Sequence, residues 1–203
     1  MAGSEARAQV PFVGLTGGIG AGKSEALAAL ERAGAATLSS DAVVHELLAS
    51  DEVRDDLVAR FGEEVAPDGK IDRDAMARLV FDDPDQRSWL EGYLWPKVGE
   101  RMWSWREELA ARADPPAAAV VEVPLLFESG MQEAFDHTIA VTADDDLRAD
   151  RIGARGHAGV AAREARQLPQ DEKAERADFR VRNDGTVEEL EEALTGILET
   201  IRA

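Results

Sequence analysis

The chain has 203 residues, of which 44% are hydrophobic, so it can fill a core as one domain with an insertion or as two small domains. It contains no cysteine, which excludes disulfides and thiolate metal sites. Its formal net charge is −18, from 41 acidic and 23 basic residues, and this charge would repel a phosphate backbone. We therefore expect no nucleic-acid partner.

Membrane and export signals are absent from the sequence pattern. No apolar run approaches the roughly 18 residues that a membrane span needs. The first nine residues are polar and lack the apolar stretch of a secretion signal, so residues 1–9 are expected to form a disordered tail. We expect a cytoplasmic protein with no membrane partner. The sequence leaves its oligomeric state open.

Strand and helix signals alternate at the start of the chain. The apolar run Phe12–Leu15 predicts a buried strand. From Lys23, apolar residues recur at helical spacing until Gly34, and this spacing predicts a helix. Ala36–Leu38 predicts a second strand that ends just before Asp41. This order is typical of βαβ units around a parallel sheet.

The middle of the chain carries helix signals only. Asp72 and Asp83 are placed as N-caps, and Pro96 predicts a kink or break in the last and longest helix. A turn is predicted at Pro67–Gly69. The predicted helices are Asp41–Ala49, Val53–Phe61, Arg73–Phe81 and a segment from Pro84 to about Ala113.

Strand signals return in the last third. The predicted elements are strands at Ala118–Val123, Thr138–Val141 and Phe179–Val181, charged helices at Asp144–Ala154 and Val160–Arg166, and a closing helix at Thr186–Ile201 capped by Thr186. The whole pattern predicts an α/β fold. Its core would comprise residues 10–45 and 116–203, and a helical insertion would occupy residues 46–115.

Gly17–Ser24 match G-x-x-x-x-G-K-[ST], the phosphate-binding P-loop. Glycines let such a loop fold tightly with its N–H groups around the phosphates, and the following helix adds its positive N-terminal end. Lys23 would reach the β- and γ-phosphates of ATP, and the Ser24 hydroxyl would ligate Mg²⁺. The motif stands between a predicted strand and a predicted helix, which is the context it requires. The alternative is a glycine-rich turn with an incidental Lys-Ser pair.

Phosphoryl transfer also needs a carboxylate that orients the acceptor hydroxyl. Asp41 follows the second predicted strand and would lie at the carboxyl edge of the sheet, where ligands bind in open α/β sheets. A plain helix N-cap is its alternative role. Glu122 ends the third predicted strand at the same edge. It could hold Mg²⁺ through a water molecule, or it could be a structural carboxylate.

Cations are also needed for the charge that develops on the transferred phosphate. Arg151 and Arg155 lie one helical turn apart, so both can face one ligand. They suit a lid, placed at about residues 145–175, that brings arginine to this phosphate. The alternative is a solvated helical face, because nine of the 23 basic residues lie between Arg148 and Arg182 among interleaved acids.

Several segments resemble the dephospho-CoA kinase family, which performs the last step of coenzyme A synthesis. Leu15–Ser24 is similar to the P-loop of that family, and Asp68–Arg73 with Phe81 is similar to its helical insertion. Glu122–Glu128, in the order Glu-Val-Pro-Leu-Leu-Phe-Glu, is a more specific match. The lid and last strand of the family are matched by Gln167, Lys173, Ala177, Asp178 and Asn183–Gly185.

The resemblance implies a three-layer P-loop kinase fold with a parallel β-sheet, a helical CoA-binding insertion and a lid. It implies that the γ-phosphate of ATP is transferred to the ribose 3′-hydroxyl of dephospho-CoA. Lys23, Asp41 and Arg151 would be the catalytic residues, and Asn183 would lie near the ATP base. The predicted nucleotide-binding residues are Gly17, Gly18, Ile19, Gly20, Ala21, Gly22, Lys23, Ser24, Glu25 and Asn183.

Some positions depart from the family pattern. Ser39 stands where an aspartate is usual, so the role of base rests on Asp41. His45 replaces an arginine, Trp95 replaces a histidine, and Glu25 replaces a small or hydroxylated residue. These changes concern acceptor binding more than ATP binding. Two other functions stay open: a P-loop kinase for a nucleoside, nucleotide or sugar, and an ATP-binding regulator without catalysis.

The tryptophans of the predicted insertion also allow two interpretations. Trp89, Tyr93 and Leu94 share helical spacing, which favours a packed helical core. The alternative is that a tryptophan stacks on the CoA adenine or contacts the pantetheine arm. The three histidines of the chain do not have the spacing of metal ligands.

Overall fold

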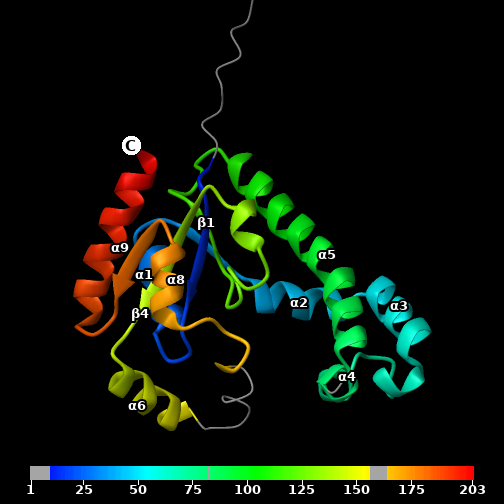
Figure 1. The fold of residues 1–203 in the computed structure, drawn as a ribbon. Helices are drawn as coiled ribbons and strands as arrows, with labels where there is room; N and C mark the ends of the chain where they lie inside the picture. The colour runs from blue at the N-terminus through cyan, green and yellow to red at the C-terminus, as the bar shows by residue number, and fades with distance from the viewer. Residues whose placement is uncertain (1–9, 82, 156–163) are drawn as a thin grey trace, which may run out of the picture. The chain divides into compact units, whose positions relative to one another are not determined.

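A computed structural model describes residues 10–81, 83–155 and 164–203 (Figure 1). The predicted tail at residues 1–9 and most of the predicted helix Val160–Arg166 lie outside these described residues. The chain divides into two compact units. The helical unit is Ser40–Ser104, and the sheet unit combines the segment that ends at Ser39 with the segment that begins at Trp105.

The sheet unit contains five parallel strands in the order β2-β3-β1-β4-β5. The strands are β1 (Phe12–Gly17), β2 (Ala36–Ser39), β3 (Ala119–Glu122), β4 (His137–Thr142) and β5 (Phe179–Arg182). Each predicted strand is confirmed within two residues. Because the strands are parallel, their carboxyl ends share one edge. The chain continues to β2 on one side of β1 and later to β4 on the other, and such a switch point is where open α/β sheets bind ligands.

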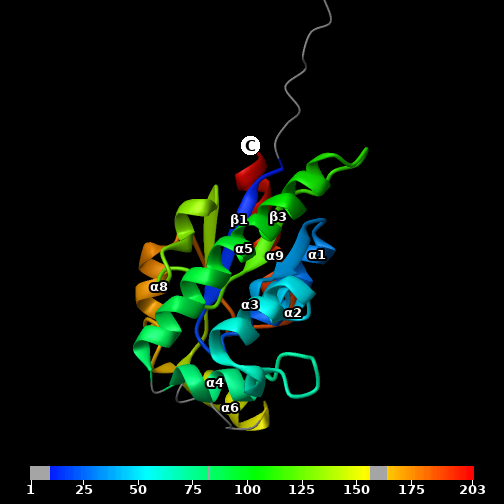
Figure 2. The same ribbon diagram turned by 90° about the vertical axis from the view of Figure 1, so that its right-hand side faces the viewer.

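Helices cover both faces of this sheet. On one face α1 (Lys23–Arg32) and α9 (Val187–Arg202) pack around buried residues such as Leu30 and Leu194. On the other face α8 (Gln170–Arg176) lies against β1 and β4. Figure 2 shows α8 and α1 on opposite sides of β1. This three-layer arrangement confirms the predicted fold class. It also explains why every residue of β1 is buried, since both faces of the strand are covered.

The helix ends of the sheet unit follow local rules. The Thr186 hydroxyl accepts a hydrogen bond from the Glu189 N–H, and the Glu189 carboxylate accepts one from the Thr186 N–H, so the predicted cap of α9 is confirmed as a capping box. The predicted charged helix from Asp144 is confirmed as α6 (Asp145–Arg155). The short helices α8 and η2 (Met131–Ala134) were not predicted, because neither has an apolar repeat.

The helical unit is built from α2 (Ser40–Leu48), α3 (Asp51–Phe61), η1 (Glu63–Val65), α4 (Arg73–Phe81) and the first part of α5 (Pro84–Ala110). The predicted caps are confirmed, since Asp72 and Asp83 each accept two backbone hydrogen bonds from the first turn of the next helix. Of the kink or break predicted at Pro96, the break does not occur, since α5 is continuous. A proline removes one backbone hydrogen bond, and the buried neighbours Leu94 and Val98 hold the helix on both sides.

The core of the helical unit contains aromatic side chains. Trp89 stacks on Tyr93 with ring centroids 5.3 Å apart, and the edge of Phe61 approaches Trp89 at 5.5 Å. The packed-core interpretation of Trp89 is therefore confirmed. Trp95 and Trp103 are exposed at 39% and 47%. Among the described helices, none combines the length and the apolar character that crossing a membrane requires.

Candidate nucleotide-binding site

The P-loop joins β1 to α1 at the carboxyl edge of the sheet. Gly20 and Gly22 have φ angles of 78° and 92°, in the left-handed region that favours glycine. A Cβ atom at Gly20 would lie 2.8 Å from the Arg148 carbonyl oxygen, and one at Gly22 would overlap the Asn183 side chain. Both glycines are thus required by their own conformation and by the close approach of the neighbouring elements.

The first turn of α1 completes the loop. Gly22 is its N-cap residue, and no side chain caps the helix. The first hydrogen bond of the helix runs from the Ala26 N–H to the Gly22 oxygen, so the N–H groups of Ser24 and Glu25 come before the first helical hydrogen bond. Uncapped N–H groups and the positive end of the helix dipole make a ready site for an anion.

Lys23 lies along the same loop. Its Nζ donates hydrogen bonds to the carbonyl oxygens of Gly17 and Gly18, both at 3.1 Å. Its side chain is half-buried, whereas the neighbouring Ser24 is exposed at the start of α1. The only ammonium group of the motif is therefore held at the loop by neutral carbonyls, which a phosphate oxygen could replace.

Side chains from outside the motif hold three successive P-loop carbonyl oxygens. Arg148 Nε donates to Ile19 at 2.9 Å, Arg151 Nη1 donates to Gly20 at 3.4 Å, and Asn183 Nδ2 donates to Ala21 at 2.9 Å. In a planar trans peptide the C=O and the next N–H point in opposite directions. The N–H groups of Gly20 and Gly22 therefore point away from α6 and Asn183.

Of the two α6 arginines that contact the P-loop, only one was predicted as a site residue. Arg151 was predicted, and it also donates to the Asn183 carbonyl oxygen at 3.0 Å. Arg148 was missed, although its spacing of three residues from Arg151 places both on one helix face. Asp145 and Glu164 lie 2.7 and 3.4 Å from the Arg148 guanidinium and balance its charge. A cavity of about 310 Å³ beside the loop is lined by Gly18, Ile19 and Arg148 and also by the acidic residues Asp145, Glu164 and Asp171.

Comparison with known proteins identifies the family. The family model described as dephospho-CoA kinase matches residues 11–189. The chain belongs to the dephospho-CoA kinase family. A dephospho-CoA kinase of Symbiobacterium thermophilum is 39% identical over 87% of this chain and 75% of its own length. One from Thermus thermophilus is 36% identical over 97% of this chain and 94% of its own. The resemblance read from the sequence is confirmed.

Solved structures share the fold of this chain. The crystal structure of TT1252 from Thermus thermophilus is 36% identical, covers 94% of this chain and 98% of its own, and superposes with a TM-score of 0.79. A dephospho-CoA kinase from Campylobacter jejuni shares the fold, with 23% identity, coverage of 93% and 96%, and a TM-score of 0.61. The predicted P-loop kinase fold is therefore confirmed.

The other predicted site residues of this chain lie on different helices and strands. Asp41 is exposed in the first turn of α2, which begins at Ser40, so Asp41 is not the N-cap. Glu122 is half-buried at the end of β3, in register with Ser39 of β2. Glu25 accepts a hydrogen bond from the Arg32 guanidinium at 3.2 Å. The roles assigned to these residues stay predictions.

A buried ion pair supports the last part of the predicted lid. Lys173 of α8 is fully buried, and its Nζ lies 3.0 Å from Glu128 Oε1 and 2.6 Å from the Pro124 oxygen. Burial lowers the pKa of Lys173, and the Glu128 carboxylate opposes that shift. Glu128 Oε1 also accepts the Leu168 N–H at 2.7 Å. The pair therefore joins α8 and the residues before it to the loop after β3.

The side chains at the P-loop fit Mg²⁺ bound chiefly through a substrate. Among the described residues, no three His, Cys, Asp or Glu side chains form a metal cage. The oxygen donors predicted for Mg²⁺ are the exposed Ser24 hydroxyl and the Glu122 carboxylate. Mg²⁺ keeps several waters and usually takes one or two protein oxygens together with substrate phosphates, so this small donor set suits it.

Proposed function

We propose that this member of the dephospho-CoA kinase family, an ATP-dependent kinase that phosphorylates dephospho-CoA, transfers the γ-phosphate of ATP to the ribose 3′-hydroxyl at its P-loop. The observation that carries this proposal is the binding of the Ile19, Gly20 and Ala21 carbonyl oxygens by side chains outside the loop. Carbonyls held from outside leave the N–H groups of the loop available for the terminal phosphates of the nucleotide.

Positioning and charge neutralisation would drive the transfer. Lys23 would exchange the carbonyls of Gly17 and Gly18 for oxygens of the β- and γ-phosphates, a stronger charge-assisted contact. Arg151 would neutralise charge on the transferred phosphate. Asp41 would orient the acceptor hydroxyl and accept its proton. These roles combine the elements of phosphoryl transfer without a covalent enzyme intermediate.

Mg²⁺ would be held by Ser24, with Glu122 contributing through a water molecule. When bound, it would neutralise charge on the β- and γ-phosphate oxygens. Asn183 is proposed to lie near the ATP base. Its position supports this, because its buried side chain already contacts the P-loop at Ala21.

Residues 46–115 are proposed to bind the acceptor, and residues 145–175 to act as the lid. The acceptor role is supported by the helical character of the described part of that insertion.

The cytoplasm is proposed as the site of action, because both substrates are intracellular metabolites. Nucleic-acid binding is not proposed, in view of the net charge of −18.

A crystal structure with ADP and Mg²⁺ tests the proposed nucleotide site. We expect the β-phosphate within the P-loop, and Lys23 Nζ moved from the two carbonyls to about 3 Å from a phosphate oxygen. We also expect the hydrogen bonds from Arg148 and Asn183 to the loop to persist. An empty P-loop, or a Lys23 side chain turned away from a bound ADP, would contradict the proposal.

A further inference from the structure

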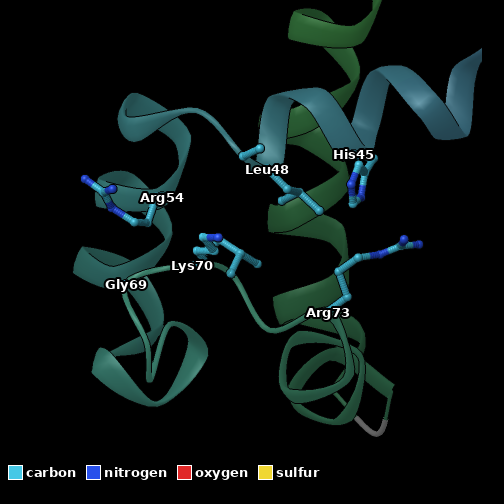
Figure 3. A pocket seen from close by; sticks show the side chains of 8 residues that line it. His45, Leu48, Arg54, Gly69, Lys70 and Arg73 are labelled. Carbon is cyan, nitrogen blue, oxygen red and sulfur yellow. The ribbon is translucent and has the colours of Figure 1, made fainter.

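A second basic site lies wholly within the helical unit. It is a pocket of about 280 Å³ between α2, α3, the loop after η1 and the start of α4 (Figure 3). Four basic side chains surround it: His45 from α2, Arg54 from α3, Lys70 from the loop and Arg73 from α4. In Figure 3, His45 and Arg73 lie on one side of the hollow, and Arg54 and Lys70 lie on the other.

The charge of this pocket contrasts with that of its surroundings. Residues 40–104 contain 16 acidic and eight Lys or Arg residues, yet no carboxylate lines the pocket. Lys70 and Arg73 bring two positive charges to this pocket, and a bound anion would relieve the repulsion between them. The composition of the lining therefore points to an anionic ligand.

Two of the cations are available to such a ligand. Arg54 is already paired with Asp51 at 2.6 Å and with Asp55 at 2.7 Å. Lys70 and Arg73 are exposed, and neither has a hydrogen-bond or ion-pair partner in the part of the chain that the structure describes. An arginine offers a planar fork that binds phosphate oxygens in pairs, and a lysine adds a mobile point charge.

The shape and the apolar walls indicate the class of anion. Leu48 and Ile71 line the pocket beside the cations, so an anionic group joined to a slim organic chain fits better than a free inorganic ion. Dephospho-CoA contains such a group, the diphosphate that links adenosine to the pantetheine arm. We propose that Lys70 and Arg73 bind this diphosphate in the pocket. The inference rests on the proposed function, because it takes dephospho-CoA as the acceptor.

Calorimetric titration of the full chain with dephospho-CoA tests the proposal. We expect Arg73→Ala and Lys70→Ala each to weaken binding about tenfold, as loss of a charge-assisted contact to phosphate would. Arg73→Lys should recover part of the affinity. The matched control is Arg78→Ala, which removes the same charge from an exposed position of the same helix outside the pocket. It should leave the affinity for dephospho-CoA within about twofold of the starting value.

Titration with ATP separates the two phosphorylated substrates, because ATP offers the same chemistry. We expect Arg73→Ala to leave ATP affinity unchanged. The inference is overturned if Arg73→Ala binds dephospho-CoA as Arg78→Ala does, or if its main loss is in ATP affinity. A chain that neither binds nor phosphorylates dephospho-CoA refutes the proposed function, and this inference with it. Normal turnover with an unaffected Arg73→Ala variant refutes the inference alone.

Discussion

Lys23 shows how a single side chain can be prepared for a ligand. Its ammonium lies between two carbonyl oxygens of its own loop, at 3.1 Å each. Such bonds to a neutral acceptor are weaker than bonds to an anionic phosphate oxygen. Nucleotide binding can therefore exchange weaker contacts for stronger ones with little movement of the chain. This exchange would contribute to both binding and catalysis.

Substitution of the two proposed catalytic residues tests their roles. We predict that Lys23→Ala and Asp41→Ala each lower kcat at least about 100-fold, because each removes a positioned group from the transition state. Steady-state kinetics with Mg-ATP and dephospho-CoA measures the effect. Arg202→Ala is the control for Lys23, since Arg202 is exposed in the last turn of α9, outside the proposed sites. A near-normal kcat for Asp41→Ala would remove Asp41 from the mechanism.

The sequence alone predicted some residues of the P-loop site but not all of them. Lys23 and Ser24 belong to a contiguous motif whose spacing carries its own physical meaning. Arg148 is far from that motif in the sequence, and its contact with Ile19 depends on where α6 lies in the fold. The approach of Asn183 to Ala21 likewise depends on the position of β5. Spacing within one segment cannot give such long-range contacts.

At the scale of single elements, α8 depends on its buried lysine more than on an apolar stripe. Six of its seven residues are polar or charged, in the order Gln-Asp-Glu-Lys-Ala-Glu-Arg. Periodicity therefore gave no signal for it. Lys173 fixes the helix to the sheet unit through Glu128 and Pro124. Removing one partner of a buried pair leaves the other charge uncompensated.

Unfolding measurements test this attachment. We predict that Lys173→Met lowers the free energy of unfolding by about 3 kcal/mol, because the largely buried Glu128 loses its counter-charge. Urea denaturation followed by circular dichroism provides the value. The double variant Lys173→Met, Glu128→Gln should recover part of the loss, since it removes the unpaired charge. If the single variant is as stable as the unchanged chain, the ion pair does not hold α8.

At the scale of the whole molecule, the sequence predicted the parallel sheet and its helical layers better than the course of α5 and the boundaries of the helical unit. Alternating strand and helix signals were sufficient for the parallel sheet, because each βαβ unit has few ways to close. The sequence predicted a kink or a break at Pro96, and α5 is continuous there, with Leu94 and Val98 buried on either side of the proline. The predicted boundaries at residues 46 and 115 stay predictions, and the compact helical unit begins at Ser40 and ends at Ser104.

The negative net charge of the chain makes local groups of cations necessary wherever an anionic substrate binds. With a net charge of −18, the chain repels polyanionic substrates at long range, more so at low salt. Lys23 and Arg151 place positive charge at the P-loop. Lys70 and Arg73 concentrate it in the pocket of the helical unit. We propose a phosphate ligand for each of these two groups of cations.

The central claim is transfer of phosphate from ATP to the ribose 3′-hydroxyl of dephospho-CoA. Incubation of the purified chain with Mg-ATP and dephospho-CoA, followed by mass detection and ³¹P NMR of the product, tests it most directly. We predict one added phosphoryl group per acceptor, at the 3′ position, with one ADP formed for each. Binding of ATP without a phosphorylated acceptor, or a clear preference for a nucleoside or sugar acceptor, would contradict the claim.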